Sequence, residues 1–204
     1  MRHADSPSWS FTEGNPWIFH LALFVRDATH LPVPPSPDVP PPLLTRPEPV
    51  GVPLSVDTGA AAEQWLAWWR RIVRLEVNER WRGLFHPPGF DSLAQSPDLR
   101  SLLTAHYLTA AEWCDATRTD GRRPGPDGYG AFPWRQVNDV AEEIAATLAV
   151  SPGAVKGAVR VLDVEGVWAF AAGPGSLLCS AGAAAEAEVR ARLLRETFVS
   201  GTGA

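Results

Sequence analysis

Ten of the chain's 20 prolines fall in residues 32–53, and this run limits what the sequence can build. Proline fixes its φ angle and has no N–H to donate, so neither a helix nor a central strand can form there. The segment is expected to be a polyproline-II arm or linker. Three roles are open: a spacer, an arm that packs on its own domain, or a ligand for an aromatic groove in a partner. As a ligand it would use Arg46 and Pro49, in the sequence RPEP.

The composition is that of an ordinary globular protein. The 204 residues suit one domain or one and a half, with 45% apolar and 20% charged residues. A net charge of −5 argues against a broad phosphate-binding surface. Of the 18 basic residues only Lys156 is lysine, a bias typical of GC-rich bacterial genomes. Cys114 and Cys179 lie far apart, so we expect neither a disulfide framework nor a zinc site, and a bacterial cytoplasmic location is the default.

The N-terminal region holds one short apolar run. Residues 17–25 include His20 and follow the acidic Asp5 and Glu13. The run is too short for an export signal or for the roughly 20 apolar residues of a membrane span. Its length and aromatic content predict a strand over 17–26. Residues 1–15 are expected to be a loose terminus.

Two amphipathic helices are predicted in the middle of the chain. The first lies in 57–82, with Asp57 or Thr58 as its cap, and the second runs from Ser96, with Pro97 at its first position, to about Arg118. The sequence WLAWWRRIVR in the first helix suits either a partner-binding face or a core helix with a solvated arginine edge. The candidate contact residues of this helix are Trp65, Trp68, Trp69 and Arg70.

The chain is therefore expected to be α+β and mostly helical. Its predicted parts are an N-terminal strand with the Pro-rich arm (1–56), a Trp-rich helical pair (57–118), a loop (119–131) and a C-terminal module of helix, short strands and helix (132–200). In the last part the predicted elements are a helix over 136–148, strands over 167–170 and 176–180, and a helix over 183–197.

The segment 140–162 has the pattern of a helix-turn-helix. A first helix would end in a turn at Ala149 and Val150, and Ser151 and Pro152 would open a second helix. The sequence IAATLAVSPGAVKGAV resembles the DNA-binding segment of sigma factor region 4 and of response-regulator tails, IA-x-x-LGVSPGTVKSRL. The resemblance implies a recognition helix that contacts DNA through Lys156 and Arg160, with Ser151 next to a phosphate. The strands that follow would then form the wing of a winged helix.

The same segment also fits a strand. Val155, Val159 and Val161 then share one face, and valine favours strands because it is branched at Cβ. With the two predicted strands that follow, this gives a three-stranded meander between two helices. Periodicity alone does not decide between a helix and a strand over 155–164.

No residues stand at a catalytic or metal-binding spacing. The histidines are scattered, and neither an HExxH, a GxSxG nor a phosphate-loop pattern occurs. We therefore expect no catalytic, cofactor or metal site. The favoured function is a non-enzymatic adaptor or assembly subunit that binds another protein, and the alternative is a winged helix-turn-helix regulator that binds DNA. An enzyme would need distant residues to converge, such as His106, Asp115 and Glu165.

Overall fold

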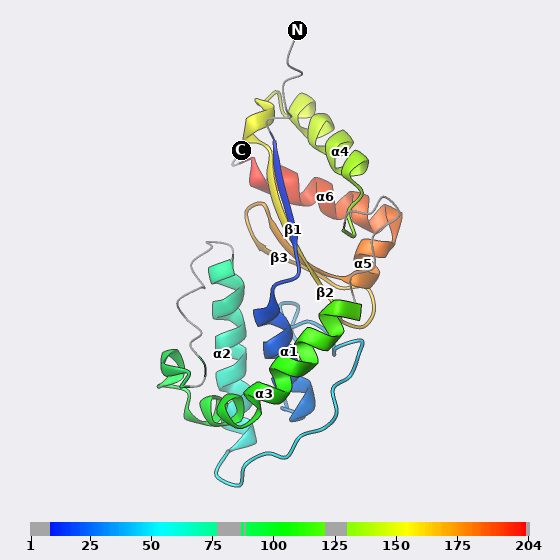
Figure 1. Ribbon diagram of the computed structural model, residues 1–204. Coiled ribbons are helices and arrows are strands. Elements are labelled where there is room, and N and C mark those ends of the chain that lie inside the picture. Colours follow the sequence, from blue (N-terminus) through cyan, green and yellow to red (C-terminus); the bar gives the residue numbers. More distant parts are fainter. Residues whose placement is uncertain (1–8, 77–86, 88, 121–129, 203–204) are drawn as a thin grey trace. The chain divides into compact units, whose positions relative to one another are not determined.

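The structure is a computed structural model in which residues 9–76, 87, 89–120 and 130–202 are described (Figure 1). These residues form an α+β fold that is mostly helical, as the sequence predicts. The chain divides into two compact units. The sheet unit comprises Met1–Asn15, Arg123–Leu162 and Gly166–Ala204, and the helical unit comprises Pro16–Arg122 and Asp163–Glu165. The helical unit is thus inserted into the sequence of the sheet unit, directly after its first strand.

The helical unit is built on α1 (Trp17–Ala28), α2 (Thr58–Glu76) and α3 (Pro97–Asp120), with a 3-10 turn, η2 (Asp91–Leu93), before α3. The predicted strand over 17–26 is wrong, because this run forms α1. The helix is buried on every side, including every residue from Ile18 to Arg26. A fully buried run has no polar face, so its sequence carries no helical periodicity to separate it from a strand.

The two longer helices of this unit confirm the predicted helical pair. Residues 77–82 of the first predicted range, and 121–129 of the predicted loop over 119–131, lie outside the described residues. The Asp57 carboxylate caps α2 by accepting the N–H groups of Gly59 at 2.8 Å and Ala60 at 3.1 Å. Asp98, in the first turn of α3, accepts hydrogen bonds from the backbone of Asp57 and from the side chain of Gln64. One carboxylate therefore fixes the start of α2 against the start of α3.

The sheet unit contains a mixed four-stranded sheet. Its strands are β1 (Ser10–Gly14), β2 (Lys156–Leu162), β3 (Ala169–Gly173) and β4 (Ser176–Ser180), in the order β1-β2-β4-β3. β2 is parallel to both β1 and β4, and β3 is antiparallel to β4. The predicted meander is therefore wrong, because β4 and not β3 lies beside β2. Residues 10–14, predicted as part of a loose terminus, form the first strand.

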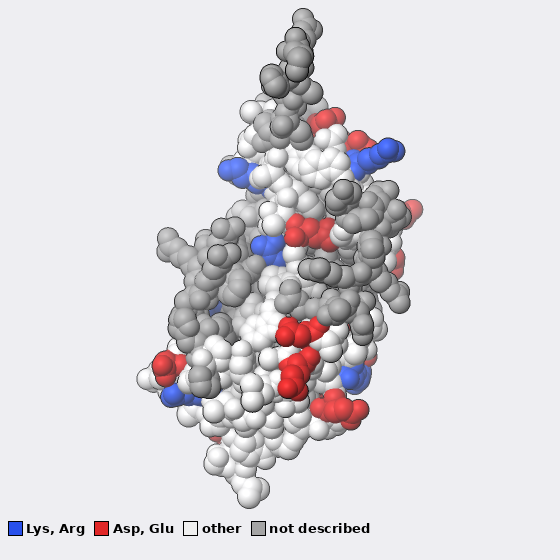
Figure 2. All heavy atoms as spheres, viewed as in Figure 1, with Lys and Arg blue, Asp and Glu red and all other residues white. Residues whose placement is uncertain are grey.

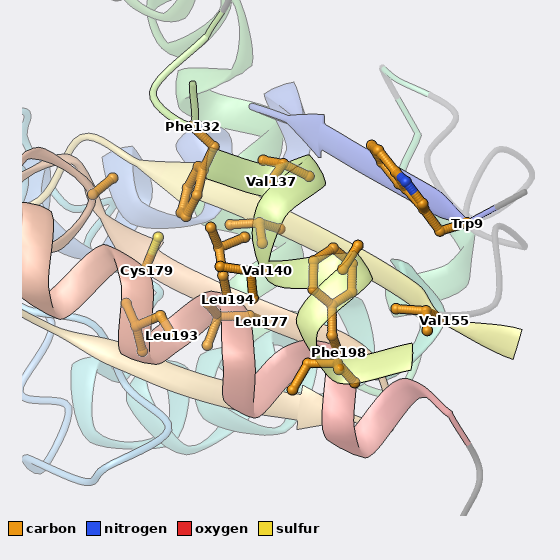
Figure 3. Close-up of a cluster of buried hydrophobic side chains, with 14 of the residues drawn as sticks. Trp9, Phe132, Val137, Val140, Val155, Leu177, Cys179, Leu193, Leu194 and Phe198 are labelled. Atoms are coloured by element: carbon orange, nitrogen blue, oxygen red, sulfur yellow. The ribbon is translucent and has the colours of Figure 1, made fainter. Parts of the chain in front are cut away.

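Helices α4 (Trp134–Thr147), α5 (Ala181–Ala185) and α6 (Ala187–Gly201) complete the sheet unit. Apolar side chains of α4 and α6 pack on one face of the sheet (Figure 3). The two helices are also joined by a bidentate ion pair, in which Nε and Nη2 of Arg195 donate to the two carboxylate oxygens of Glu143 at 3.2 and 3.1 Å. The core residues labelled in Figure 3 are Trp9, Phe132, Val137, Val140, Val155, Leu177, Cys179, Leu193, Leu194 and Phe198.

The second helix of the predicted helix-turn-helix does not form. Residues Pro152–Ala154 make a single 3-10 turn, η3, and Lys156–Leu162 are β2. Gly157 suits the strand, because a Cβ atom there would lie 2.8 Å from the Phe198 ring and β2 can approach that ring so closely only without one. Pairing on both edges, with β1 and β4, then satisfies the backbone of β2.

The structure has a turn at Ala149, where the sequence predicts one. Ala149 has a φ of 51°, the N–H of Val150 bonds the carbonyl of Ala145 and the N–H of Ala149 bonds that of Ala146. This is a Schellman motif with alanine in the left-handed position that glycine normally takes. α1 ends in the same way, with His30 at a φ of 52°.

Candidate functional site

The tryptophans predicted as a contact surface lie inside the helical unit. Trp65, Trp68 and Trp69 are all buried, and the rings of Trp65 and Trp69 are stacked with centroids 5.6 Å apart. Trp65 donates its indole N–H to the carbonyl of Ala22 at 2.7 Å. These rings hold α2 against α1, so the interpretation of WLAWWRRIVR as a core helix fits the structure and an exposed aromatic face does not.

The Pro-rich segment packs on the helical unit through its carbonyl groups. Arg26, 7% exposed, donates to the carbonyl of Pro40 at 2.6 Å and to that of Pro41 at 2.9 Å. Trp69 donates its indole N–H to the carbonyl of Asp38 at 2.7 Å. Leu43 is fully buried and pairs with Val164 in an antiparallel bridge. Of the three open roles, the structure therefore shows an arm that packs on its own domain.

The basic candidate residues of this unit form ion pairs at the surface. Arg70 contacts the Asp38 carboxylate at 2.7 Å, which lowers the pKa of that carboxyl group. Arg46 contacts Glu165 at 2.8 Å, and both side chains are largely exposed. Exposed pairs of this kind contribute roughly 0.2–1 kcal/mol each. Pro49 is exposed.

The three predicted DNA-contacting residues do not share a helix. Ser151 precedes η3 without capping it through its side chain, Lys156 begins β2, and Arg160 lies further along β2 with its side chain against Gly14. Figure 2 shows both blue and red side chains on the face drawn, and no continuous blue patch among the described residues. The geometry of a recognition helix is therefore missing from these residues.

An aromatic pair in the sheet unit is the feature that sequence analysis missed. Trp134, the first residue of α4, is 52% exposed, and its ring centroid lies 4.6 Å from that of Trp9. Trp9 is 6% exposed, and among the described residues its indole N–H has no hydrogen-bond acceptor. Trp134 stands three residues before Val137, so helical spacing assigns it to the buried stripe. Nothing in the pattern indicates that it is exposed.

This pair belongs to the same unit as the edge strand β1. Ser10 donates its N–H to the carbonyl of Val155 at 3.1 Å, which fixes the register of β1 on β2. In a parallel pair the N–H and C=O of one residue face the same neighbour, so those of Phe11 and Glu13 point away from β2. We call this side the outer edge of β1. Among the described residues no strand pairs with it.

A half-buried carboxylate, that of Glu13, and a buried thiol, that of Cys179, lie near the end of β1. The Glu13 carboxylate accepts the N–H groups of Ala131 at 2.6 Å and Phe132 at 3.2 Å, which anchors the chain just before α4. Burial, and next the negative charge of Glu13, raise the pKa of the Cys179 thiol to about 12. A thiol that stays protonated is a poor nucleophile, and the Cys179 side chain is fully buried in the core of the sheet unit.

Within the described residues, neither metal ligands nor a membrane-spanning helix gives a further site. In the ranges that the structure describes, no three His, Cys, Asp or Glu side chains converge as metal ligands would. No described helix is long and apolar enough to cross a membrane. Comparison with family models, with curated proteins and with solved structures gave no match to the chain. The candidate site is therefore the outer edge of β1 together with Trp134 and Trp9.

Proposed function

We propose that the chain is a non-enzymatic subunit that binds another protein, and that the outer edge of β1 beside Trp134 receives an extended segment of that partner. The exposed Trp134 ring is the observation that carries this proposal. Tryptophan is the residue type most enriched among the energetically dominant residues of interfaces. A ring that is half exposed and supported by a second, buried ring offers a rigid apolar contact at little entropic cost.

The edge strand β1 favours a partner segment that is extended over one that is helical. The N–H and C=O groups of Phe11 and Glu13 alternate along the outer edge, and only an extended backbone matches that spacing. A partner strand would gain main-chain hydrogen bonds from β1 and would place an apolar side chain against Trp134. The DNA-binding alternative loses its main support, because Lys156 and Arg160 stand on a strand.

A peptide selection tests the proposal. Short random peptides are selected on the full chain, and their dissociation constants are measured by calorimetry for the native chain and for Trp134→Ser. We expect the serine variant to bind about 10-fold more weakly or worse, as for other dominant interface residues. Bound peptide should also slow amide hydrogen exchange at Phe11 and Glu13.

A matched control separates this site from general stickiness. Val199, on α6 of the same unit, is 44% exposed, and Val199→Ser should leave peptide binding unchanged. Peptides that bind Trp134→Ser as tightly as the native chain would remove this site from consideration. A selection that yields no binder to the native chain would do the same.

A further inference from the structure

The helical unit recognises one part of its own Pro-rich segment, residues 38–43, with the sequence DVPPPL. Two consecutive carbonyls of this segment, those of Pro40 and Pro41, accept hydrogen bonds from the single guanidinium of Arg26. A third, that of Asp38, accepts the indole N–H of Trp69. All three donors are side-chain N–H groups of α1 and α2, and all three acceptors are main-chain carbonyls.

The donors are held in place independently of the segment. Arg26 forms an ion pair with Asp27 at 2.6 Å, and its guanidinium lies 5.5 Å from the centre of the Trp65 ring. Trp69 stacks on Trp65 and also meets Phe19 edge to face. Arg26 and Trp69 are therefore presented in fixed positions by α1 and α2, as in a preorganised binding site.

Side-chain donors of this kind suit a polyproline ligand. A proline-rich chain cannot donate along its backbone, so its carbonyls must be satisfied by donors from elsewhere. Its conformation is already fixed before binding, so little entropy is lost, and aromatic side chains are the usual surface on which it docks. Arg26 and Trp69 supply these donors, and the Trp69 indole also brings an aromatic ring to the segment.

The two ends of the segment add selectivity. At one end the Asp38 carboxylate contacts Arg70 at 2.7 Å. At the other end the N–H of Leu43 is donated to the second oxygen of Asp27 at 2.7 Å, and the Leu43 side chain is fully buried. The segment held between these ends consists of an acidic residue, a valine, three prolines and a leucine.

We propose that these residues of α1 and α2 form a polyproline-recognition site, that residues 38–43 are its intramolecular ligand, and that a partner segment of the pattern acidic–x–Pro–Pro–Pro–Leu competes for it. The tether keeps the internal ligand at an effective concentration in the millimolar range. An external segment therefore binds well only after the binding of the internal segment has been weakened. The internal segment then acts as an autoinhibitory ligand, at a site separate from the outer edge of β1.

The test weakens the binding of the internal segment and adds a peptide of the same sequence from outside. The probe is a synthetic peptide with the sequence of residues 36–44, SPDVPPPLL, titrated into the full chain and followed by tryptophan fluorescence. Leu43→Ala removes one buried anchor and keeps every carbonyl. We expect this variant to bind the peptide at least ~10-fold more tightly than the native chain does, because the internal competitor is weaker.

Two controls test which chemical groups the binding depends on. A peptide with serine in place of the three central prolines should bind neither chain. Trp69→Phe, added to Leu43→Ala, should weaken binding of the native peptide because one carbonyl donor is lost. A chain in which residues 38–43 are replaced by a Gly-Ser linker should regain thermal stability when the peptide is added, even if it is unfolded alone.

Two results would overturn the proposal. One is equal affinity of Leu43→Ala for the proline and serine peptides. The other is the absence, up to millimolar peptide, of both a fluorescence change in Leu43→Ala and a thermal shift in the linker chain. Trp134→Ser should leave all of these results unchanged, so this test and that of the β1 edge can fail separately.

Discussion

Trp69 donates its indole N–H to the main-chain carbonyl of Asp38 at 2.7 Å, and this bond ties α2 to a segment that cannot donate at its prolines. Trp69→Phe keeps an aromatic ring but removes the N–H donor together with the five-membered part of the buried indole. We expect the free energy of unfolding to fall by about 1–2 kcal/mol, because the carbonyl then lacks its protein donor. Urea unfolding followed by circular dichroism measures the change. An unchanged midpoint would mean that water satisfies this carbonyl equally well.

Ala149 ends α4 in a left-handed conformation that disfavours a Cβ atom, with a φ of 51°. Ala149→Gly should therefore raise the free energy of unfolding by about 1 kcal/mol. The exposed Ala146, inside α4, is the matched control, and Ala146→Gly should lower stability by roughly 0.5–1 kcal/mol. Thermal unfolding of the two variants gives opposite shifts. Shifts of the same sign would contradict the assigned turn.

Gly157 permits the close approach of β2 to α6. A Cβ atom at this position would lie 2.8 Å from one carbon of the Phe198 ring, so Gly157→Ala should destabilise the chain by roughly 1–3 kcal/mol. Gly51→Ala is the control, because no heavy atom lies within 4 Å of the corresponding Cβ position. The measurement is denaturant unfolding of both variants. Similar small effects would show that the Phe198 ring moves aside freely.

The buried Cys179 thiol predicts a loss of stability at alkaline pH. Its pKa is raised from 9.0 to about 12 in the folded chain, so between these values the unfolded state releases a proton that the folded state keeps. Ionisation therefore favours unfolding, and stability should fall as the pH rises through this window. Cys179→Ala should show a shallower decline of the free energy of unfolding above pH 9. If the native chain and this variant decline in parallel, the thiol does not titrate in this way.

The parts of the fold that sequence could predict are those with local signals. α2 carries an apolar stripe and a capping aspartate, α3 carries an apolar stripe and an initial proline, and both helices lie where the stripe predicts them. α1 carries no such stripe because it is buried on all sides. β1 was not predicted because its stability comes from β2, at the far end of the sequence, and the short run SFTEG gives no sign of that partner.

The candidate site was harder to predict than the fold. Sequence analysis selected Trp65, Trp68 and Trp69 for their number and spacing, but that spacing is what a core helix needs. It passed over Trp134, whose exposure depends on where the first turn of α4 lies in the sheet unit. Aromatic periodicity shows which rings share a face. Whether that face is covered is decided by segments distant in sequence.

The order of segments along the chain has a consequence for its synthesis. β1 is made early but pairs with Lys156–Leu162, and the helical unit receives the bridging residue Val164 only after all its helices are made. On the ribosome, neither unit can reach its final set of partners until residue 165 has emerged. The helical unit can therefore complete its contacts once residue 165 has emerged, whereas the sheet unit must wait for β3, β4 and α6, which ends at Gly201. A chain released before Lys156 would carry an unpaired β1 and an incomplete bridge at Leu43.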